Sequence, residues 1–545
     1  MSITKIAHCS VVEPIHQDFS HTPWTDQTSN TDLGQNFFVV STPQAFANRL
    51  GTVRLEENGN FFLSPLPSSD PNDPLYWTKS FKFYILGLSS TILFFTTFIT
   101  AGIVLTAQQL SDFFSVPNHK VAGLYIYPFL GNFLSLVFLT PLSTKYGRRP
   151  FYLSGLVILV VACVWASLAR SYHSFLSARL LIGMGHGMFQ SMVPLTIVDT
   201  FFVIERGFAL SIYSAIFSGG AMSGVIVTAF SLHFISYKLT YLVVAIIYII
   251  VLALVLLTFP ETAFKRDATS RALAREKLVG LRRLRILNGC FVDENLARLI
   301  LRPLGFMCFP SVTWSLLVFG CHNGALAAVN VITCRILVKP PYSFSTFQIG
   351  TLFIPSLLFV LLAMYISGPL CKHLLRCLTT RNKGIFEPEM RLPALLPTLI
   401  ISPAAFFLYA AALEYKLHWA WISLALAIFQ YSIVSSITIP LAYNLDILKP
   451  IAPEVIVATF TGKALITWSM GAHVIHTTQS DGPMKVFCAL AAVSFVVLSP
   501  IVLFIFEGKK IRRAAIQWRI LKWMLWSTDR EDYEPVVEST IRNLG

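Results

Sequence analysis

The sequence predicts an all-α membrane protein with twelve transmembrane helices in two six-helix bundles. Twelve apolar stretches of about 20 residues follow one another along the chain, and a helix of that length crosses the hydrocarbon core of a bilayer. Only 13% of the residues are charged, 54% are hydrophobic, and the mean hydropathy is +0.64. A basic segment after the sixth stretch divides the twelve into two equal sets.

Polar and apolar segments define five regions in chain order. Residues 1–82 are mostly polar and lack helical periodicity, so we expect a largely disordered cytoplasmic tail. The two bundles occupy residues 83–260 and 306–506, a basic cytoplasmic linker 261–305, and a second tail 507–545. The predicted spans are 83–107, 121–142, 150–170, 174–197, 208–233, 238–259, 306–334, 347–371, 393–413, 418–441, 453–476 and 484–506.

Basic residues gather in alternate loops between the predicted spans. The 2–3 loop contains Lys145, Arg148 and Arg149, and the 6–7 linker and the 8–9 loop are also rich in Lys and Arg. Cytoplasmic loops of membrane proteins carry such an excess of positive charge. We therefore expect both termini and the linker to lie in the cytoplasm.

The second tail combines a basic run at residues 509–513 with apolar residues and tryptophans. This mixture is typical of a cationic amphipathic helix that lies along the inner leaflet and binds anionic lipid. We predict such an interfacial helix within residues 507–545 and keep a simple solvated tail as the alternative.

The composition excludes several classes of function. The net charge of +14 is concentrated in short loops, so no nucleic-acid partner is expected. None of the nine cysteines forms a Cys-x-x-Cys pair, and we find no metal-ligand cluster. The chain also lacks a Gly-x-x-x-x-Gly-Lys-Ser loop and a nucleophile with a nearby base. We predict a protein that is neither ATP-driven nor an enzyme, that needs no cofactor or metal, and that acts as a monomer.

Five segments carry a family resemblance. They are Pro141-Leu-Ser-Thr-Lys-Tyr-Gly-Arg-Arg149 after span 2, Arg179-Leu-Leu-Ile-Gly183-Met-Gly185 in span 4, Phe259-Pro-Glu-Thr262 at the end of span 6, Asp70-Pro-Asn-Asp-Pro-Leu-Tyr-Trp77 before span 1 and Glu387-Pro-Glu-Met-Arg-Leu-Pro393 in the 8–9 loop. The first three resemble signatures of the major facilitator superfamily, and the last two resemble its fungal drug:proton antiporters. The resemblance implies the major facilitator fold.

Two departures from the family pattern affect the predicted antiport. Thr144 stands where the 2–3 loop signature has an aspartate, and Pro141 stands where it has a glycine. Span 5 contains Gly219-Gly220-Ala-Met-Ser-Gly224 without the proline that antiporters of this family usually carry there. These departures weaken the prediction of antiport and leave the predicted fold unchanged.

The resemblance implies a central cavity lined mainly by spans 1, 4, 7 and 10, as in transporters that work by alternating access. Polar and ionisable residues within spans are costly, so we treat them as functional candidates. The substrate-binding candidates are Thr97, Arg179, His186, Gln190, His322, Asn323, Asn330, Gln430 and Tyr431. Each could instead form an interhelical hydrogen bond, and Arg179 could hold the first bundle together.

The 2–3 loop suggests a conformational latch. The residues assigned to it are Lys145, Gly147, Arg148, Arg149 and Asp199. Gly147 permits a tight turn, and Asp199 at the inner end of span 4 can pair with Lys145 or Arg148 in one state and release it in the other. The alternative is a set of orientation charges with a surface pair of little energetic value. Asp446 ends span 10 as Asp199 ends span 4, which fits an internal repeat.

No aspartate or glutamate lies clearly inside a predicted span. If transport is coupled to protons, His186 or His322 is the expected carrier, because imidazole titrates near neutral pH. Lys463 also lies within span 11, and we expect its amine to reach the inner surface or a carbonyl.

The leading interpretation is secondary active transport at the plasma membrane, with proton-coupled efflux of a drug-like compound or secondary metabolite. The expected partners are a small-molecule substrate, protons and membrane lipids. Uptake of a nutrient such as a polyamine, and a non-transporting sensor with the same fold, are the alternatives. A polar centre favours transport, and an occluded apolar centre favours the sensor.

Overall fold

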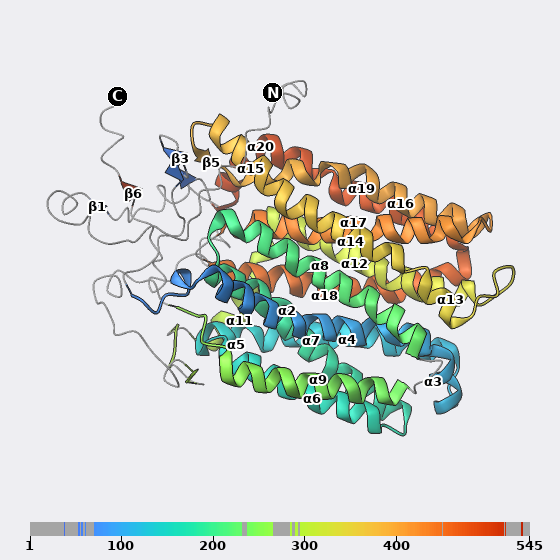
Figure 1. Cartoon of the computed structure of the whole chain (residues 1–545). Coiled ribbons are helices and arrows are strands. Elements are labelled where there is room, and N and C mark those ends of the chain that lie inside the picture. Colours follow the sequence, from blue (N-terminus) through green and yellow to red (C-terminus); the bar gives the residue numbers. More distant parts are fainter. Residues whose placement is uncertain are drawn as a thin grey trace.

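The computed structural model describes residues 70–231, 237–264, 284–285, 289–292, 295–448, 451–516 and 518, and the backbone of five two-residue strands in the remaining segments. Within the described chain, twelve helices are long and apolar enough to cross a membrane, as the sequence predicted. They lie side by side as one elongated bundle (Figure 1). Most of the two predicted tails and of the linker falls outside the described residues.

The helices of the first half follow the predicted spans closely. In chain order they are η2 (Pro74–Tyr76), α2 (Lys79–Gly102), η3 (Ile103–Thr106), α3 (Ala107–Phe114), α4 (Asn118–Phe138), α5 (Thr140–Tyr146), α6 (Arg149–Leu168), α7 (Tyr172–Thr200), α8 (Val203–Ser231) and α9 (Tyr237–Thr258). The six spans are α2 with η3, α4 with α5, α6, α7, α8 and α9.

The second half repeats this pattern with more interruptions. Its helices are α11 (Leu296–Phe306), α12 (Pro310–Leu337), α13 (Thr346–Thr351), α14 (Ile354–Tyr365), η5 (Ile366–Leu370), α15 (Cys371–Arg381), η6 (Pro388–Leu395), α16 (Leu396–Glu414), α17 (Trp419–Ile447), α18 (Ala452–Asp481), α19 (Pro483–Leu498) and α20 (Pro500–Ile516). The eighth and twelfth spans run on to 381 and 515, well beyond the predicted ends, because helical hydrogen bonding continues after the apolar run has ended.

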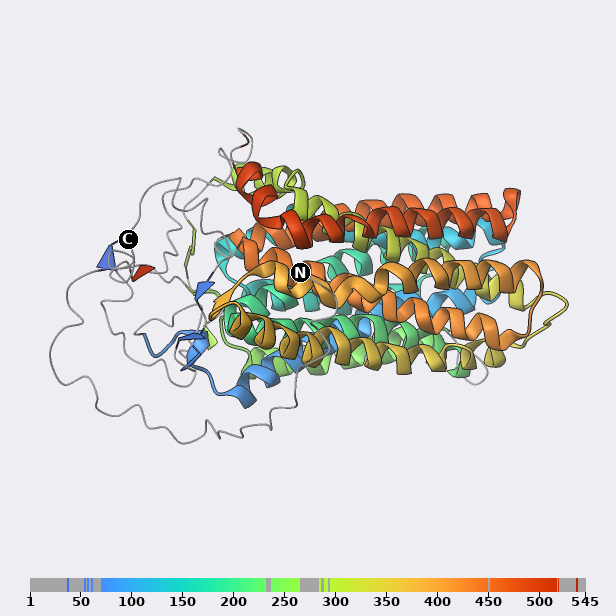
Figure 2. The same cartoon turned by 90° about the horizontal axis from the view of Figure 1, so that it is seen from above.

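Helix packing separates the two halves and also joins them. In the first half α2 packs on α8, α4 on α7, and α6 on α7 and α9. In the second half α12 packs on α18, α14 on α17, and α16 on α17 and α19. The halves meet where α18 contacts α4 and where α8 contacts α14 and α17. Figure 2 shows the same layers from above.

The two ends of the bundle differ in structure. One end, here called the α5 end, holds α5, α11 and α15, and the opposite α3 end holds α3 and α13 (Figure 1). Three short antiparallel strand pairs complete the fold: β1 (Phe37–Phe38) with β6 (Val536–Val537), β2 (Val53–Arg54) with β5 (Ile385–Phe386), and β3 (Glu56–Glu57) with β4 (Asn60–Phe61). The described start of the second tail continues α20, where Arg512 is buried against Glu389.

Candidate functional site

A buried lysine links the two bundles at their centre. Lys463 of α18 donates a hydrogen bond from Nζ to Oε1 of Gln190 in α7, at 3.2 Å, and both side chains are 0% exposed. Each residue lies about 15 Å along its helix from the α5 end, at 1.5 Å of rise per residue, which is close to the middle of a bilayer core. Of the two contacts expected for the Lys463 amine, the inner surface is wrong, and the amine instead meets a carbonyl oxygen, that of the Gln190 side chain in the opposite bundle.

The amide of Gln190 is held in one orientation. Its Oε1 accepts a second hydrogen bond from Nδ2 of Asn132 in α4, at 3.0 Å. The Tyr213 hydroxyl of α8 donates to the backbone carbonyl of Gln190 at 3.0 Å. Because both acceptor positions of Oε1 are occupied, the amide presents its Nε2 donor elsewhere, and Nε2 has no hydrogen-bond partner among the described residues.

Aromatic rings surround the lysine amine. The Nζ atom of Lys463 lies 4.8 Å from the ring centre of Phe319 in α12 and 5.4 Å from that of Phe217 in α8. The imidazole of His186 lies 6.0 Å from the same Phe217 ring, and neither of its nitrogens has a partner in the described chain. Ring faces attract a cation, so this arrangement suits a charged amine. We call His186, Gln190, Phe217, Phe319 and Lys463 the central cluster.

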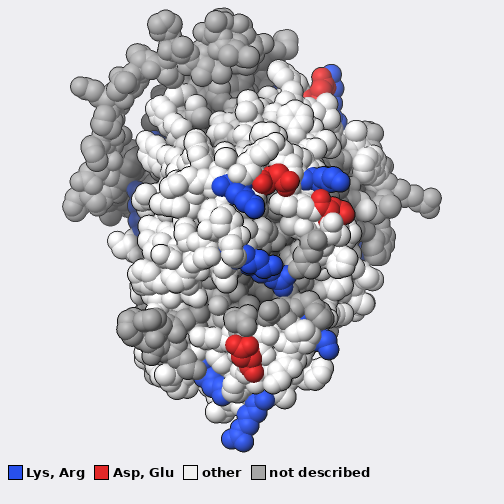
Figure 3. Space-filling view, turned by 90° about the vertical axis from the view of Figure 1, so that its right-hand side faces the viewer, with Lys and Arg blue, Asp and Glu red and all other residues white. Residues whose placement is uncertain are grey.

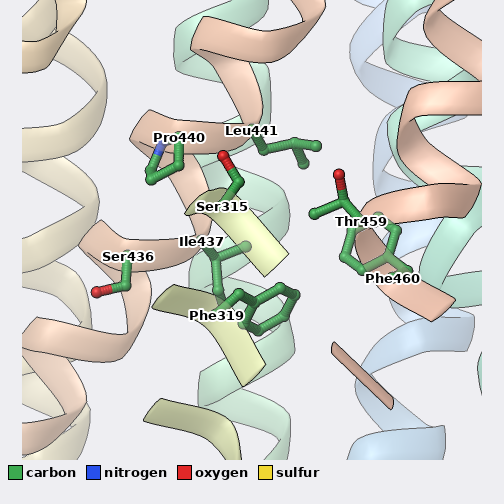
Figure 4. Close-up of a pocket in the computed structure, with 8 residues that line it drawn as sticks. All are labelled: Ser315, Phe319, Ser436, Ile437, Pro440, Leu441, Thr459 and Phe460. Carbon is green, nitrogen blue, oxygen red and sulfur yellow. The ribbon is translucent and has the colours of Figure 1, made fainter. Parts of the chain in front are cut away.

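A small cavity adjoins the central cluster on the side of the α5 end. It is a narrow gap between side chains, without room for a water molecule. Its walls come from α12, α17 and α18 (Figure 4), and the lining residues are Ser315, Phe319, Ser436, Ile437, Pro440, Leu441, Thr459 and Phe460. The Phe319 and Phe460 rings, whose centres are 5.7 Å apart, lie between this cavity and the lysine, which is one helical turn beyond Phe460.

Arg179 lies inside the first bundle and away from the central cluster. Its guanidinium donates to the backbone carbonyls of Leu124 (3.1 Å), Ile99 (3.0 Å) and Thr100 (3.2 Å) and to the Tyr241 hydroxyl (3.3 Å). Ile99 and Thr100 precede η3, where α-helical hydrogen bonding ends and carbonyls are left without helical partners. Arg179 thus ties α2, α4 and α9 to α7, which favours the structural alternative over substrate binding.

His322 is enclosed by the second bundle. Its Nδ1 lies 2.7 Å from the backbone carbonyl of Val318 and its Nε2 lies 2.8 Å from the hydroxyl of Ser402 in α16. The hydroxyl of Ser494 in α19 is 3.3 Å from the same Nε2. The structure therefore places the two histidines predicted as proton carriers in different surroundings, and only His186 belongs to the central cluster.

Two further candidates have partners inside their own bundle. The Thr97 hydroxyl bonds back to its own helix, at 3.1 Å from the carbonyl of Leu93. Asn323 donates from Nδ2 to the hydroxyl of Thr467 in α18, at 3.1 Å. Contacts of this kind hold membrane helices together. They favour a structural role for Thr97 and Asn323, and substrate binding by these two side chains stays a prediction.

Three candidates lie near the interface between the bundles. Gln430 of α17 donates from Nε2 to the sulfur of Met222 in α8, at 3.1 Å. Asn330 of α12 is buried, and neither polar atom of its amide has a hydrogen-bond partner in the described chain. Tyr431 is buried where α8, α14 and α17 meet. Their assignment to substrate binding stays a prediction.

The 2–3 loop is organised around Glu261, which sequence analysis placed only in a family motif. Its carboxylate accepts the backbone N–H groups of Arg148 (2.7 Å) and Arg149 (3.1 Å) at the start of α6, and those of Thr262 and Ala263 in its own loop. An anion at this position caps the helix N-terminus. Burial raises the pKa of Glu261 above its ordinary value. The backbone hydrogen bonds and the charge of Arg148 act in the opposite direction, but burial has the larger effect.

The predicted latch residues contact one another within the first bundle. Arg148 pairs with Asp199 at 3.3 Å, one of the two pairings expected. Gly147 forms the turn with φ +97°, a region that favours glycine. Arg149 donates from Nη2 to the carbonyl of Leu256 at 2.8 Å. The carbonyl of Lys145 accepts a hydrogen bond from the backbone N–H of Phe291 at 2.8 Å. A latch that opens and closes stays a prediction.

Arg391 in the 8–9 loop forms a contact that does cross between the bundles. Its Nε donates to the carboxylate of Asp446 at the end of α17, and both side chains are almost fully buried. Its Nη2 donates to the backbone carbonyl of Val203 at the start of α8, at 2.9 Å. The pairs Arg148–Asp199 and Arg391–Asp446 thus occupy equivalent places in the two halves, and the Arg391–Val203 hydrogen bond also joins the halves at the α5 end.

The Major Facilitator Superfamily profile matches residues 86–471, which is more than two thirds of the chain. The chain belongs to this superfamily. Among its relatives, Protein HOL1 of Saccharomyces cerevisiae is 20% identical over 84% of this chain and 91% of its own length. The probable drug/proton antiporter YHK8 of the same yeast is 24% identical over 69% of this chain and 74% of its own length.

The solved structures agree with this fold. The proton:xylose symporter XylE of E. coli matches 79% of this chain and 97% of its own chain, with a TM-score of 0.57 and 14% identity. The fungal relatives confirm the resemblance predicted from the motifs, and the chain is a secondary transporter of the Major Facilitator Superfamily with twelve spans.

Sequence reasoning missed Asn132, Glu261 and Arg391 as organising residues and misplaced Lys463. The signal for Lys463 was present, because an ionisable residue inside an apolar span is a functional candidate by default. Arg391 gave no comparable signal, since a loop arginine is expected on the surface. Its burial depends on Asp446 and Val203, which lie far from it in sequence and meet it only through the fold.

Proposed function

We propose that this superfamily member exports a small organic molecule across the plasma membrane by proton-coupled alternating access. The observation that carries the proposal is the Lys463–Gln190 hydrogen bond, which joins the bundles in a buried polar centre. Buried polar side chains at the meeting surface of two lipid-embedded bundles are costly, and a transported solute supplies a reason for them. The polar centre favours transport over the sensor.

Closure at both ends supports an occluded state of the transport cycle. At the α5 end, Arg391 holds the carbonyl of Val203 across the bundle interface. At the α3 end, α13 packs on α8, where Gly350 lies against Ala229. Opening to one side then requires the contacts at that end to separate while those at the other end persist. The Lys463–Gln190 hydrogen bond lies between the two ends, so opening at either end is expected to affect it.

Charge distribution supports a cytoplasmic α5 end. Buried and surface basic residues gather there, among them Arg148, Arg149, Arg206, Arg302, Arg376, Arg381 and Arg391. Figure 3 looks onto the α3 end, where Lys and Arg are scattered among mostly uncharged side chains. The positive-inside rule then puts the α5 end, with the linker and both termini, in the cytoplasm.

His186 is the preferred site of proton coupling within this proposal. It is buried, its ring nitrogens have no partner among the described residues, and it shares the Phe217 ring with Lys463. A proton on the imidazole would place a second positive charge near the lysine, which gives protonation a direct effect on the centre. The relative YHK8, a probable drug/proton antiporter, supports the same direction and coupling.

Cells with and without the protein would test the proposal. Growth is measured on a panel of toxic organic compounds, with a pH gradient and with an uncoupler. We expect lower accumulation of at least one compound in cells that carry the protein, and loss of the difference with the uncoupler or with His186→Ala. His173→Ala is the matched control, because His173 is exposed at the start of the same helix. Equal accumulation for every compound would contradict transport, and an effect that survives the uncoupler would contradict proton coupling.

The polyamine alternative receives no support from the centre. A polyamine carries several positive charges, and a protonated Lys463 would place an ammonium where such a substrate would bind. Like charges repel strongly in a site of low dielectric constant.

A further inference from the structure

We infer that the central cluster binds an organic anion, with Lys463 as the partner of the substrate's carboxylate. This inference names the substrate class of the proposed transporter and therefore rests on the proposed function. Its first support is a charge imbalance. An ammonium buried without an opposite charge costs several kcal/mol in a protein interior. When it is protonated, Lys463 has a hydrogen-bonding amide and two aromatic rings around it, none of which carries a full negative charge.

The buried carboxylates of the described chain are engaged elsewhere. Asp446 pairs with Arg391, Glu454 with Arg302 and Glu389 with Arg512. The other two, Asp70 and Asp73, lie before α2 and accept hydrogen bonds from Asn72 and from the backbone N–H of Leu75. All three pairs lie toward the α5 end, at the starts or ends of helices. Arg179 also lacks a carboxylate, but its guanidinium donates to three carbonyls and a hydroxyl. Among the described residues Lys463, at mid-depth, has one side-chain oxygen as its hydrogen-bond partner, and a negatively charged ligand would supply the opposite charge.

The neighbouring polar atoms are suited to the same ligand. The Nε2 of Gln190 is a donor without a described partner, and its Oε1 is already occupied by Asn132 and Lys463. His186 can donate from either nitrogen according to its tautomer or charge, and both nitrogens are buried without a partner in the described chain. A centre rich in donors binds an acceptor, and a carboxylate offers about four acceptor sites.

The apolar walls define the rest of the substrate. The Phe217 and Phe319 rings flank the amine. Phe319 and Phe460 also line the narrow cavity on the side of the α5 end (Figure 4). That cavity is lined mainly by apolar side chains, with a few hydroxyls such as those of Ser315 and Thr459. A monocarboxylate with an aromatic or aliphatic body fits this pattern, with the charged group at Lys463 and the body against these apolar walls once the bundles move apart to admit it.

Anion binding would also change the link between the bundles. In the structure described here, the lysine amine uses one donor on Gln190 of the opposite bundle. A carboxylate is the stronger partner for an ammonium, because both groups are charged. It would therefore compete with the Gln190 oxygen for Lys463 and weaken the direct hydrogen bond between the bundles.

Binding to the purified full-length protein in lipid nanodiscs tests the inference. The probes are a panel of aromatic and aliphatic monocarboxylates, each compared with its matched primary amide and amine. We expect carboxylates to bind and to raise the melting temperature, with the amide and amine of each set at least tenfold weaker. Lys463→Met should weaken carboxylate binding by on the order of 100-fold, and Lys463→Arg should retain most of it.

Controls separate this inference from the proposed function. Lys485→Met removes an exposed lysine near the start of α19 and should leave binding unchanged. The melting temperature of each ligand-free variant shows whether it folds. If Lys463→Met does not fold, carboxylate binding by Lys463→Arg still tests the role of the positive charge. Failure of every carboxylate to bind, preference for the amine, or undiminished binding by Lys463→Met would overturn the inference. Export of a neutral or cationic compound in the cell assay would leave the proposed function intact while ruling out the anion.

Discussion

Removal of the Arg391 side chain tests the contact that closes the α5 end. Arg391→Ala removes the ion-pair partner of Asp446, whose side chain is about 1% exposed in the parent and whose Oδ1 already has no hydrogen-bond partner in the described chain. Breaking one side of a buried ion pair costs about 3–5 kcal/mol, because the remaining charge cannot return to water. The carbonyl of Val203 also loses a charged donor, so we expect a loss near the upper end of that range.

A double-mutant cycle measures the pair directly. Unfolding free energies are obtained by SDS titration in detergent micelles for Arg391→Ala, Asp446→Asn and the double variant. Because the neutral amide removes the unpaired charge, the double variant should be more stable than the sum of the two single losses predicts, by about 2–3 kcal/mol. Additive losses, or a loss below about 1 kcal/mol for Arg391→Ala, would refute the assignment of a buried pair.

The same variant has a conformational consequence. The thiol of Cys371 is buried and lies beside Arg391, so its reaction with a maleimide reports opening of the α5 end. We expect faster labelling of Cys371 in Arg391→Ala than in the parent, measured by peptide mass spectrometry. The exposed Cys308 of the same protein provides the internal control, since its labelling rate should not change.

Three further predictions follow from the packing and charges of the first bundle. Arg179→Lys should lower the melting temperature, since one ammonium cannot reach three carbonyls and a hydroxyl, while the substrate profile in the cell assay stays unchanged. Gly183→Ala should disrupt α4–α7 packing, because a Cβ there meets the backbone of Pro128, whereas Gly219→Ala, with open space around it, should be tolerated as measured by yield of folded protein. The pKa of Glu261 is raised in the folded protein. Its stabilising contribution is therefore present below the unfolded-state pKa and is lost as pH rises through the folded-state pKa. Glu261→Gln should flatten the melting-temperature profile over this pH range.

The sequence predicted the number and order of the spans because hydrophobic length alone determines which segments can cross a bilayer. Span ends were less predictable, as α15 shows: its basic residues stopped the apolar pattern at 371, yet the helix continues to Arg381. The apolar pattern of a sequence shows which part of a helix lies in lipid. The helix itself can extend further, into water, because its hydrogen bonds do not depend on lipid.

The candidate site was predictable in its residue types and only partly in its geometry. His186 and Gln190 were correctly placed on one helix with buried side chains, yet spacing along a helix does not reveal which residue of another helix lies opposite. Lys463 illustrates this: a lysine eleven residues into its helix can extend toward either surface or across the interface, and only tertiary packing decides. His322 was equally plausible from sequence, but Ser402 and Ser494 enclose it within one bundle.

The hydrogen bond from Arg391 to the main chain of Val203 responds differently to mutation of its two residues. A carbonyl oxygen is common to all twenty amino acids, so exchange of residue 203 alters the neighbouring side-chain packing and leaves the acceptor in place. Substitutions that strengthen or weaken this contact between the two halves must therefore be made at Arg391, in the segment between the eighth and ninth spans. Engineering of a faster or slower transporter would begin there.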